Sequence, residues 1–377
     1  MANAVKEKKK KSGVKTLIIV LVIIAVIIGA GIGTISFMVR PVYDNSSNAK
    51  YVGGMLKSDS IEYQSDDAKG LKNNLIIKIM QLVWKSTDKS DKAKHALQKE
   101  PEGVVKVKDI PYLDTNNPYH MLDVYYPEGI LPNEGLPVII DIHGGGWMYA
   151  TKDLNEYYCM ELARKGYTVF SISYRLVPDV TVNEQIQDCS SALKWISDNM
   201  SDYPANPETV MLTGDSAGGM LSSYEAVLNQ SEELREIFGT CETNLNIKCL
   251  VLTSPCAYMK NGGPMSIYTK MLWGKDYKDK ATYDYMDISE IIDYADDMPP
   301  TYFITSSGDS IAHDQTVTEY NLFIERGIEC EINDYGEYDG KKLPHVFSVL
   351  DPFGKPGQDV IDEALEFYQN TLLKEHV

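Results

Sequence analysis

The sequence predicts an α/β fold built on a mostly parallel eight-stranded sheet with helices on both faces. From residue 104 onward, short apolar runs alternate with segments of helical periodicity, the order expected for a parallel sheet. Residues 137–142 form a nearly continuous apolar run, as in a strand buried on both faces. Residues 214–218 read Gly-Asp-Ser-Ala-Gly between a β-branched run and a helical segment, which indicates a sharp strand-to-helix turn.

The individual elements follow in order from this periodicity. Strands are expected at residues 104–110, 119–126, 137–142, 167–172, 210–213, 248–253, 301–305 and 328–333. Helices are expected at residues 71–84, 153–165, 182–200, 219–228, 314–326 and 358–373, where apolar residues recur every three or four positions. Residues 254–299 separate two strands and are too many for an irregular loop, so we expect a helical insertion there.

The N-terminus predicts a membrane anchor. Residues 1–16 form a basic tail, and residues 17–39 carry no charge, which at ~1.5 Å per residue is enough to cross a bilayer core of ~30 Å. The alternative is a cleaved signal peptide, whose apolar region is usually ~7–15 residues long. The positive-inside rule predicts a single-pass protein of the cell membrane, with a cytoplasmic N-terminus and the rest of the chain on the outer face. Residues 40–103 would be a linker and helical cap segment, and residues 104–377 the main domain.

Charge and cysteine content exclude several function classes. The net charge is −18 although the basic residues gather at the N-terminus, so the body of the protein repels phosphate backbones and nucleic-acid binding is not expected. The six cysteines form no C-x-x-C pattern, which argues against zinc and thioredoxin-like chemistry. Their disulfide pairing is left open, and no metal or organic cofactor is implied.

Ser216 is the candidate nucleophile, because the turn at residues 214–218 lifts its hydroxyl clear of the sheet edge. A serine hydroxyl needs a base, and in this architecture the histidine follows the acid in the sequence. His313 lies where the acid belongs, and His376 lies next to the C-terminus. His345 follows the last expected strand and is therefore the predicted base.

The base needs a carboxylate that orients its ring. Asp309 lies in the turn after the strand at residues 301–305, at the edge of the sheet where such a carboxylate is required. Asp314 is the alternative, although its position suits a charge at the start of the helix that follows. Asp309 is the preferred acid.

Residues 143–147 read His-Gly-Gly-Gly-Trp directly after the strand at residues 137–142. Gly144, Gly145 and Gly146 have no Cβ, so their backbone amides can approach the oxyanion of a tetrahedral intermediate. The amide of Ala217 would add a further donor. We interpret the histidine of this run as a residue that shapes the loop.

Together with Tyr-Arg-Leu-Val-Pro at residues 174–178, these motifs resemble the hormone-sensitive-lipase-like branch of the α/β-hydrolase fold, which contains carboxylesterases and acetyl esterases. The resemblance covers residue 104 to the C-terminus and implies a triad of Ser216, Asp309 and His345. It also implies an oxyanion hole made by amides of Gly145, Gly146 and Ala217, and Gly144 is kept with them. The chain departs from the family pattern at Val346, where a glycine usually follows the histidine, and after Asp309, where Asp-Pro-Leu is usual.

The expected function is that of a membrane-anchored serine esterase acting on short-chain acyl or acetyl esters of small molecules, glycans or lipids. Residues 40–103 and 254–299 would form a cap over the acyl site, with Tyr258, Tyr268 and Tyr283 as candidates to line it. Two alternatives stay open: a serine peptidase of the same fold, and a non-catalytic binding module on a hydrolase scaffold.

Overall fold

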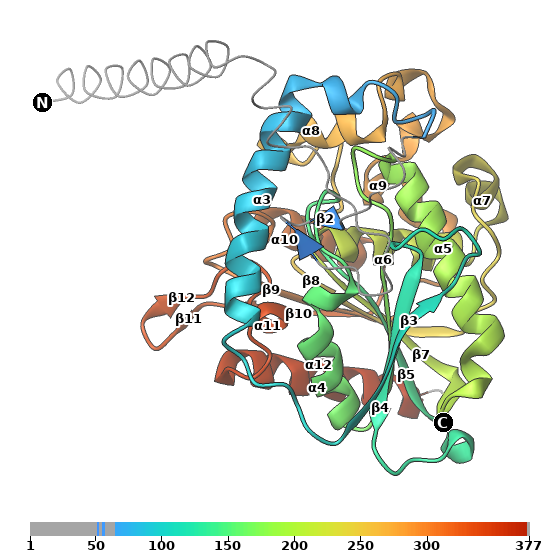
Figure 1. The fold of residues 1–377 in the computed structure, drawn as a ribbon, viewed down its shortest axis with the longest axis vertical. Helices are drawn as coiled ribbons and strands as arrows, with labels where there is room; N and C mark the ends of the chain where they lie inside the picture. Colours follow the sequence, from blue (N-terminus) through green and yellow to red (C-terminus); the bar gives the residue numbers. More distant parts are fainter. Residues whose placement is uncertain (1–50, 53–54, 57–64, 375–377) are drawn as a thin grey trace, which may run out of the picture.

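The computed structural model describes residues 51–52, 55–56 and 65–374. Two short strands, β1 (Tyr51–Val52) and β2 (Met55–Leu56), pair with each other, and eight longer strands form the central sheet. The eight strands are β3 (Val104–Pro111), β4 (Met121–Pro127), β5 (Leu136–Ile142), β6 (Thr168–Ile172), β7 (Ala205–Asp215), β8 (Ile247–Thr253), β9 (Thr301–Ser306) and β10 (Cys330–Tyr335). A small hairpin of β11 (Glu337–Tyr338) and β12 (Lys341–Lys342) projects beyond β10 (Figure 1).

The strand order in the central sheet is β10-β9-β8-β7-β5-β6-β4-β3. β4 runs antiparallel to both of its neighbours, and all other pairs are parallel. This arrangement confirms the predicted α/β-hydrolase fold with a mostly parallel eight-stranded sheet. Because β5 and β7 are neighbours in the middle of the sheet, the segments that follow them start side by side at one edge.

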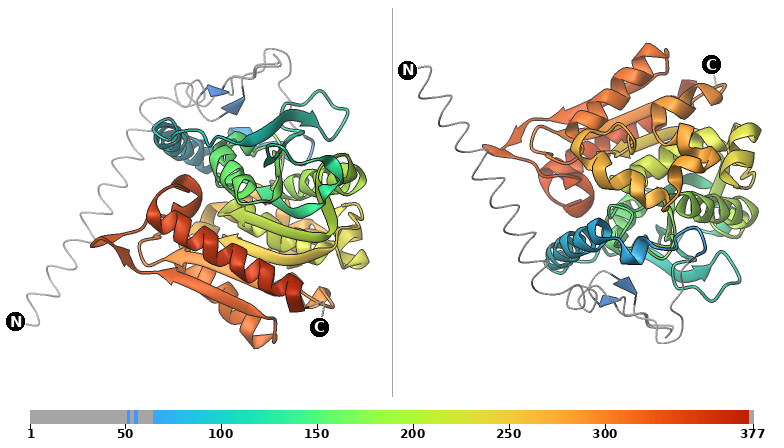
Figure 2. Two further views of the ribbon diagram at one scale, coloured as in Figure 1. Left: turned by 90° about the horizontal axis from the view of Figure 1, so that it is seen from below. Right: turned by 90° about the horizontal axis from the view of Figure 1, so that it is seen from above.

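Helices cover both faces of the sheet, as Figures 1 and 2 show. The α-helices are α3 (Leu75–His95), α4 (Glu156–Arg164), α5 (Val182–Asn199), α6 (Ala217–Leu228), α7 (Glu232–Phe238), α8 (Ser266–Thr269), α9 (Ile288–Ile291), α10 (His313–Glu325), α11 (Phe347–Leu350) and α12 (Lys355–Lys374). Short 3-10 turns are η1 (Leu71–Asn73), η2 (Pro132–Glu134), η3 (Lys152–Leu154), η4 (Met200–Asp202), η5 (Gly263–Met265), η6 (Lys270–Trp273), η7 (Tyr277–Asp279), η8 (Ala281–Tyr285) and η9 (Ile292–Tyr294). α7 and the β11–β12 hairpin were not expected from the sequence.

The sheet separates two apolar cores because successive strand residues point to opposite faces. Val138 and Ile140 of β5 belong to the core shared with α5, α6 and α10. Ile139, between them, belongs to the core that α4 and α12 cover. All three residues have no exposed surface, which explains the continuous apolar run in the sequence.

Two segments outside the sheet and its flanking helices lie together at one end of the molecule (Figure 1). Residues 263–294 form short helices between β8 and β9, and α3 begins beside them. The Asn74 side chain caps α3 by accepting from the amides of Ile76 and Ile77. The same side chain donates to Met271 Sδ at 3.8 Å, so the start of α3 contacts the insertion. The domain boundaries given above, including the cap at 40–103 and 254–299, stay a prediction.

The membrane localisation requires a correction. Within residues 51–52, 55–56 and 65–374, no helix combines the length and the apolarity needed to cross a bilayer. The predicted localisation, with an outer-face domain tethered by a single membrane span, is therefore wrong by this test. The segment on which it was based, residues 17–39, lies outside the described residues, as do the basic tail at 1–16 and residues 40–50.

All six cysteines have free thiols. Four of them are buried, two in each core: Cys189 and Cys256 on one side, Cys159 and Cys249 on the other. Burial raises the pKa of Cys159 and Cys249 well above the ordinary value, so these thiols are chemically quiet.

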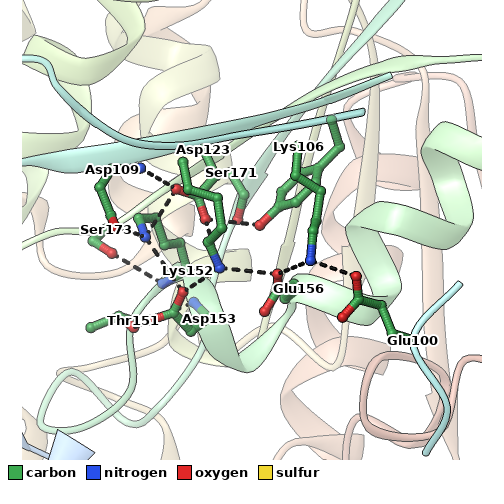
Figure 3. Close-up of polar contacts among 12 residues, drawn as sticks. Glu100, Lys106, Asp109, Asp123, Thr151, Lys152, Asp153, Glu156, Ser171 and Ser173 are labelled. Carbon is green, nitrogen blue, oxygen red and sulfur yellow. Dashed lines mark hydrogen bonds and ion pairs between the residues drawn. The ribbon is translucent and has the colours of Figure 1, made fainter. Parts of the chain in front are cut away.

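An ion-pair network centred on the buried Lys152 side chain holds the segment just after residues 143–147 (Figure 3). Lys152 Nζ lies 2.8 Å from Asp109 Oδ1, 3.0 Å from Asp123 Oδ1 and 3.4 Å from Asp153 Oδ1. Asp109 lies in an irregular part of the β3–β4 pairing, and its amide donates to Asp123 Oδ1. Burial alone would lower the pKa of Lys152, but the three carboxylates outweigh that effect and raise it. The network thus ties the sheet edge to the segment that leads into α4.

Lys152→Met should destabilise the fold by about 3 kcal/mol, because it removes the buried counter-charge of Asp123, which then keeps only the more distant Lys108 at 3.5 Å. Urea unfolding followed by circular dichroism measures this loss. Lys106→Met is the matched control: its side chain is 29% exposed and sits at the rim of the same cluster, so it should cost at most about 1 kcal/mol. Equal effects of the two substitutions would contradict a central role for Lys152.

Candidate active site

Ser216 lies on the sharp turn between β7 and α6. Its backbone angles are φ 54° and ψ −115°, a region that a non-glycine residue adopts only when its surroundings impose it. The Ser216 amide donates to Thr253 O at 2.9 Å, and its carbonyl accepts from the Cys256 amide at 3.1 Å. A Cβ on Gly214 would lie 2.4 Å from Gly218 O, so only glycine fits there. The geometry is that of a nucleophile elbow.

Asp309 and His345 are joined directly. His345 Nδ1 lies 2.8 Å from Asp309 Oδ2, while Asp309 Oδ1 accepts from the amides of Ile311 at 2.8 Å and Ala312 at 3.0 Å. Burial by itself would raise the pKa of Asp309. The hydrogen bond and charge of His345 lower it to about 2, helped by the Ala312 amide and the Ser254 hydroxyl. Asp309 therefore stays ionised at neutral pH and can fix the imidazole tautomer.

The alternative acid lies elsewhere. The Asp314 side chain is fully exposed at the start of α10, where Oδ1 lies 3.2 Å from Nδ1 of the neighbouring His313. His313 also faces Asp334, with 3.1 Å between Nε2 and Oδ2. These contacts form a surface pair at the helix start, and His345 pairs with Asp309 instead.

Ser216 and His345 are not hydrogen-bonded to each other within the described part of the chain. The Ser216 hydroxyl instead lies 3.8 Å from the Cys256 thiol. His345 is nevertheless close enough to the elbow for its charge to act on Asp215, the residue before Ser216, where it opposes the effect of burial on the pKa. Catalytic hydrogen bonds are often long or misaligned before substrate binds, and a rotation of the serine side chain is a small motion. The structure thus joins two of the three predicted residues and leaves the third on the adjacent turn.

The loop at residues 143–147 divides its amides between two tasks. The Gly144 amide donates to Asp215 Oδ1 at 2.9 Å, so it binds the loop to the elbow. Among the described residues, the amides of Gly145, Gly146 and Ala217 have no acceptor. Gly145 and Gly146 have φ values of 110° and 55°, a backbone conformation that glycine adopts readily. The arrangement provides donors of the kind that stabilise an oxyanion.

His143 supports this loop through contacts with Gly144 and Tyr174. Its Nδ1 lies 2.6 Å from Gly144 O, and its ring stacks on Tyr174 with 4.3 Å between centroids. The Tyr174 hydroxyl donates to His143 O at 2.8 Å. Burial lowers the pKa of His143 to about 4, so the ring is neutral at pH 7. These contacts agree with its interpretation as a residue that shapes the loop.

A pair of buried carboxylates beneath the loop was missed by the sequence reasoning. The Asn155 side-chain amide donates to Asp215 Oδ1 at 2.9 Å and to both Asp141 oxygens at 3.2 Å. Burial and the neighbouring Asp215 raise the pKa of Asp141 to about 7, although Asn155 and Ser171 donate to it. The available signal was an aspartate interrupting an otherwise apolar strand just before the glycines.

The predicted cap tyrosines differ in their surroundings. Tyr268 of α8 is 6% exposed, and its buried hydroxyl has no hydrogen-bond partner within residues 51–52, 55–56 and 65–374. Tyr283 lies under Lys260, whose Nζ is 4.9 Å from the ring centroid. Tyr258 pairs with Asp287 through a single bridge. Their role in lining the site stays a prediction. Within the described residues no group of three or more His, Cys, Asp or Glu side chains is arranged to hold a metal ion.

Comparison with known proteins supports this assignment of the fold. A family model described as BD-FAE matches residues 122–321. Esterase B from Lactobacillus rhamnosus aligns in three dimensions with a TM-score of 0.73 and 31% identity, covering 78% of this chain and 94% of that one. An esterase from the archaeon Pyrobaculum calidifontis aligns with a TM-score of 0.58 at 22% identity, over 77% and 93% of the two chains, which supports the fold alone.

Among curated relatives, the esterase LipQ of Mycobacterium tuberculosis is 29% identical over 139 residues, 37% of this chain and 33% of its own length. The chain thus matches about a third of that relative. These relatives and solved structures confirm the resemblance to carboxylesterases of the α/β-hydrolase fold.

The stability of the protein should fall at acid pH in part through Asp309. The Asp309 carboxyl has a pKa of about 2 in the folded protein and 3.8 in the unfolded chain. It therefore stabilises the fold at pH values above 3.8, and this stabilisation is lost as the pH falls toward 2. The full effect is about 2 kcal/mol, of which about 1 kcal/mol should be lost between pH 6 and pH 3. Urea unfolding at several pH values measures it. Asp309→Asn should lack this portion of the pH dependence, and identical slopes for both proteins would contradict the assignment.

Proposed function

The chain belongs to the BD-FAE family, and on that premise we propose that it is a serine esterase that hydrolyses short-chain carboxylic esters through an acyl-enzyme. The proposed triad is Ser216, Asp309 and His345. The proposed oxyanion donors are the amides of Gly145, Gly146 and Ala217. Gly144 supports them through its bond to Asp215.

The observation that carries this proposal is the joint geometry of the elbow and the Asp309–His345 pair. The backbone of Ser216 is strained, and the close packing of Gly214 against Gly218 leaves no room for larger residues beside it. Such strain costs free energy and is usually retained where function uses it. A buried carboxylate bound to Nδ1 leaves Nε2 of His345 as the free basic nitrogen. Free amides on the neighbouring loop supply the third requirement of acyl transfer.

In the first half-reaction, Ser216 Oγ attacks the ester carbonyl carbon and its proton passes to His345 Nε2. The carbonyl oxygen becomes negative and accepts hydrogen bonds from the amides of Gly145, Gly146 and Ala217. The intermediate collapses, the bond to the alcohol oxygen breaks, and His345 returns the proton to that oxygen. Asp309 remains ionised throughout and stabilises the imidazolium.

In the second half-reaction, water attacks the acyl carbon of the Ser216 ester and gives a proton to His345 Nε2. The second tetrahedral intermediate uses the same amides. When it collapses, the carboxylic acid leaves and the proton returns to Ser216 Oγ. One ester and one water give one acid and one alcohol, so no other reactant is needed.

We propose short acyl chains because Ser216 is only 7% exposed, and we assign the cover of the site to a cap formed by residues 65–103 and 254–299. A solved structure of the Lactobacillus rhamnosus esterase B is described with a C4-C4 tributyrin phosphonate, which supports a comparable range here. The alcohol could belong to a small molecule, a glycan or a lipid.

Ser216→Ala should reduce hydrolysis of 4-nitrophenyl acetate on the order of 10³-fold or more, because it removes the atom that forms the acyl-enzyme. A fluorophosphonate probe should add to Ser216 in the wild type, as mass spectrometry of the peptide would show. Ser307→Ala is the control: Ser307 is an exposed serine outside the site and should lose nothing. A wild type that neither turns over the ester nor takes up the probe would favour a binding module.

An acyl series tests the substrate class. The ratio kcat/KM should fall from 4-nitrophenyl butyrate to 4-nitrophenyl octanoate and laurate, since a covered site limits the chain that fits. A preference for the laurate would contradict the short-chain proposal. Faster cleavage of an aminoacyl anilide than of any ester would replace it with peptidase activity.

A further inference from the structure

Helix α3 contacts the loop that carries the proposed oxyanion donors, although it lies outside the residues 122–321 that match the family. Trp84 of this helix packs against Gly146. A Cβ on Gly146 would lie 2.5 Å from Trp84 Cζ2 and 2.6 Å from Cε2, so the indole occupies the place of a side chain. The contact between Trp84 and residue 146 is therefore possible only because Gly146 has no side chain.

A second contact joins the same helix to the same loop. The Trp84 ring stacks on Tyr149, with 5.6 Å between centroids and 23° between planes. The Tyr149 hydroxyl in turn donates to Asp91 Oδ2 of α3 at 3.0 Å. Gly145 O accepts from the amides of Met148 and Tyr149 at 3.0 and 3.1 Å, so Tyr149 also closes the turn that contains the donors.

The loop needs such support because of its own composition. Consecutive glycines at positive φ have wide conformational freedom, and ordering them costs more entropy than ordering other residues. An oxyanion hole works only when its amides are fixed within about 0.5 Å of the productive position. The Gly144 amide fixes one side of the loop to Asp215, and the opposite side, at Gly146, faces Trp84.

The indole N–H does not explain the position of Trp84. Its Nε1 is buried and donates to no acceptor among the residues that the structure describes, while the residue as a whole is 9% exposed. A buried donor without a partner is unfavourable, so the ring packing must outweigh that cost. The aromatic face, and not the N–H group, is what this position uses.

We propose that Trp84 is a positioning residue for the oxyanion hole: its ring holds the Gly145–Gly146 turn so that the amides point at the developing oxyanion. The inference rests on the proposed function and extends it by assigning to α3 a part in catalysis. Trp84 should therefore act on the transition state, because the loop amides stabilise the oxyanion that forms there more than the planar ester.

The test uses a trifluoromethyl ketone with a butyl chain as the probe. Ser216 Oγ adds to the ketone carbon, its proton passes to His345, and the ketone oxygen becomes an oxyanion held by the loop amides. Trp84→Ala, in the full chain, should lower kcat/KM for 4-nitrophenyl butyrate about 10- to 100-fold and raise the ketone inhibition constant by a similar factor. KM should change less than about 3-fold, because the planar ester does not need the oxyanion contacts.

Trp84→Phe keeps an aromatic face but removes the N–H and the outer ring atoms that lie nearest Gly146, so its kcat/KM and ketone inhibition constant should change by less than about 10-fold and clearly less than in Trp84→Ala. Ile77→Ala is the matched structural control. Ile77 lies on the same face of α3, two turns earlier, and is fully buried, so its loss should lower the urea midpoint without changing ketone binding.

The outcomes separate the two proposals. A wild type that does not bind the ketone would overturn the proposed function itself. A Trp84→Ala variant that binds the ketone as the wild type does would overturn the role of Trp84 alone. Equal losses in Trp84→Ala and Trp84→Phe would show that an aromatic face at this position does not hold the loop, and equal losses in Trp84→Ala and Ile77→Ala would assign the effect to general destabilisation. Either result contradicts the inference.

Discussion

The candidate site depends on the close approach of two neighbouring strand ends. β5 and β7 pair in the centre of the sheet, and the elbow after β7 lies in close contact with the loop after β5. A Cβ on Gly218 would lie 1.9 Å from Ile142 O, and one on Gly144 would lie 2.3 Å from Asp215 Oδ2. No other residue type fits at this separation. This close contact brings Ser216 near the free amides of the loop, and the Gly144–Asp215 hydrogen bond holds the loop and the elbow together.

The acidic groups near the elbow and the oxyanion loop differ in their ionisation. Asp309 is ionised and paired with His345. Asp141 and Asp215 both accept from the side-chain amide of Asn155, and their burial disfavours the charged form of each. Burial raises the pKa of both carboxyls, which weakens the negative charge beneath the oxyanion loop. The polar groups at the site are therefore matched to a reaction in which negative charge appears at the loop.

Much of this could be predicted from the sequence, because it depends on local chemistry. The elbow at Ser216 has a strict glycine pattern, and the order of elements after it singles out His345 and favours Asp309 over Asp314. Contacts between distant segments could not be predicted. The sequence of α3 indicates an apolar helix but not that Trp84 meets Gly146. The glycine run does not reveal which amide is engaged by Asp215, and no pattern indicated that Ser216 would contact Cys256. The anchor argument relied on the length of an uncharged run and on the basic residues before it, and the described helices give it no support.

The free thiols have a consequence for where the fold can be acquired. Its two cores are held by packing and hydrogen bonds, and its buried cysteines lie in both without a covalent link between them. The two cores therefore pack without any thiol oxidation, so a reductant such as glutathione should leave the packing of the described residues intact wherever the fold is acquired.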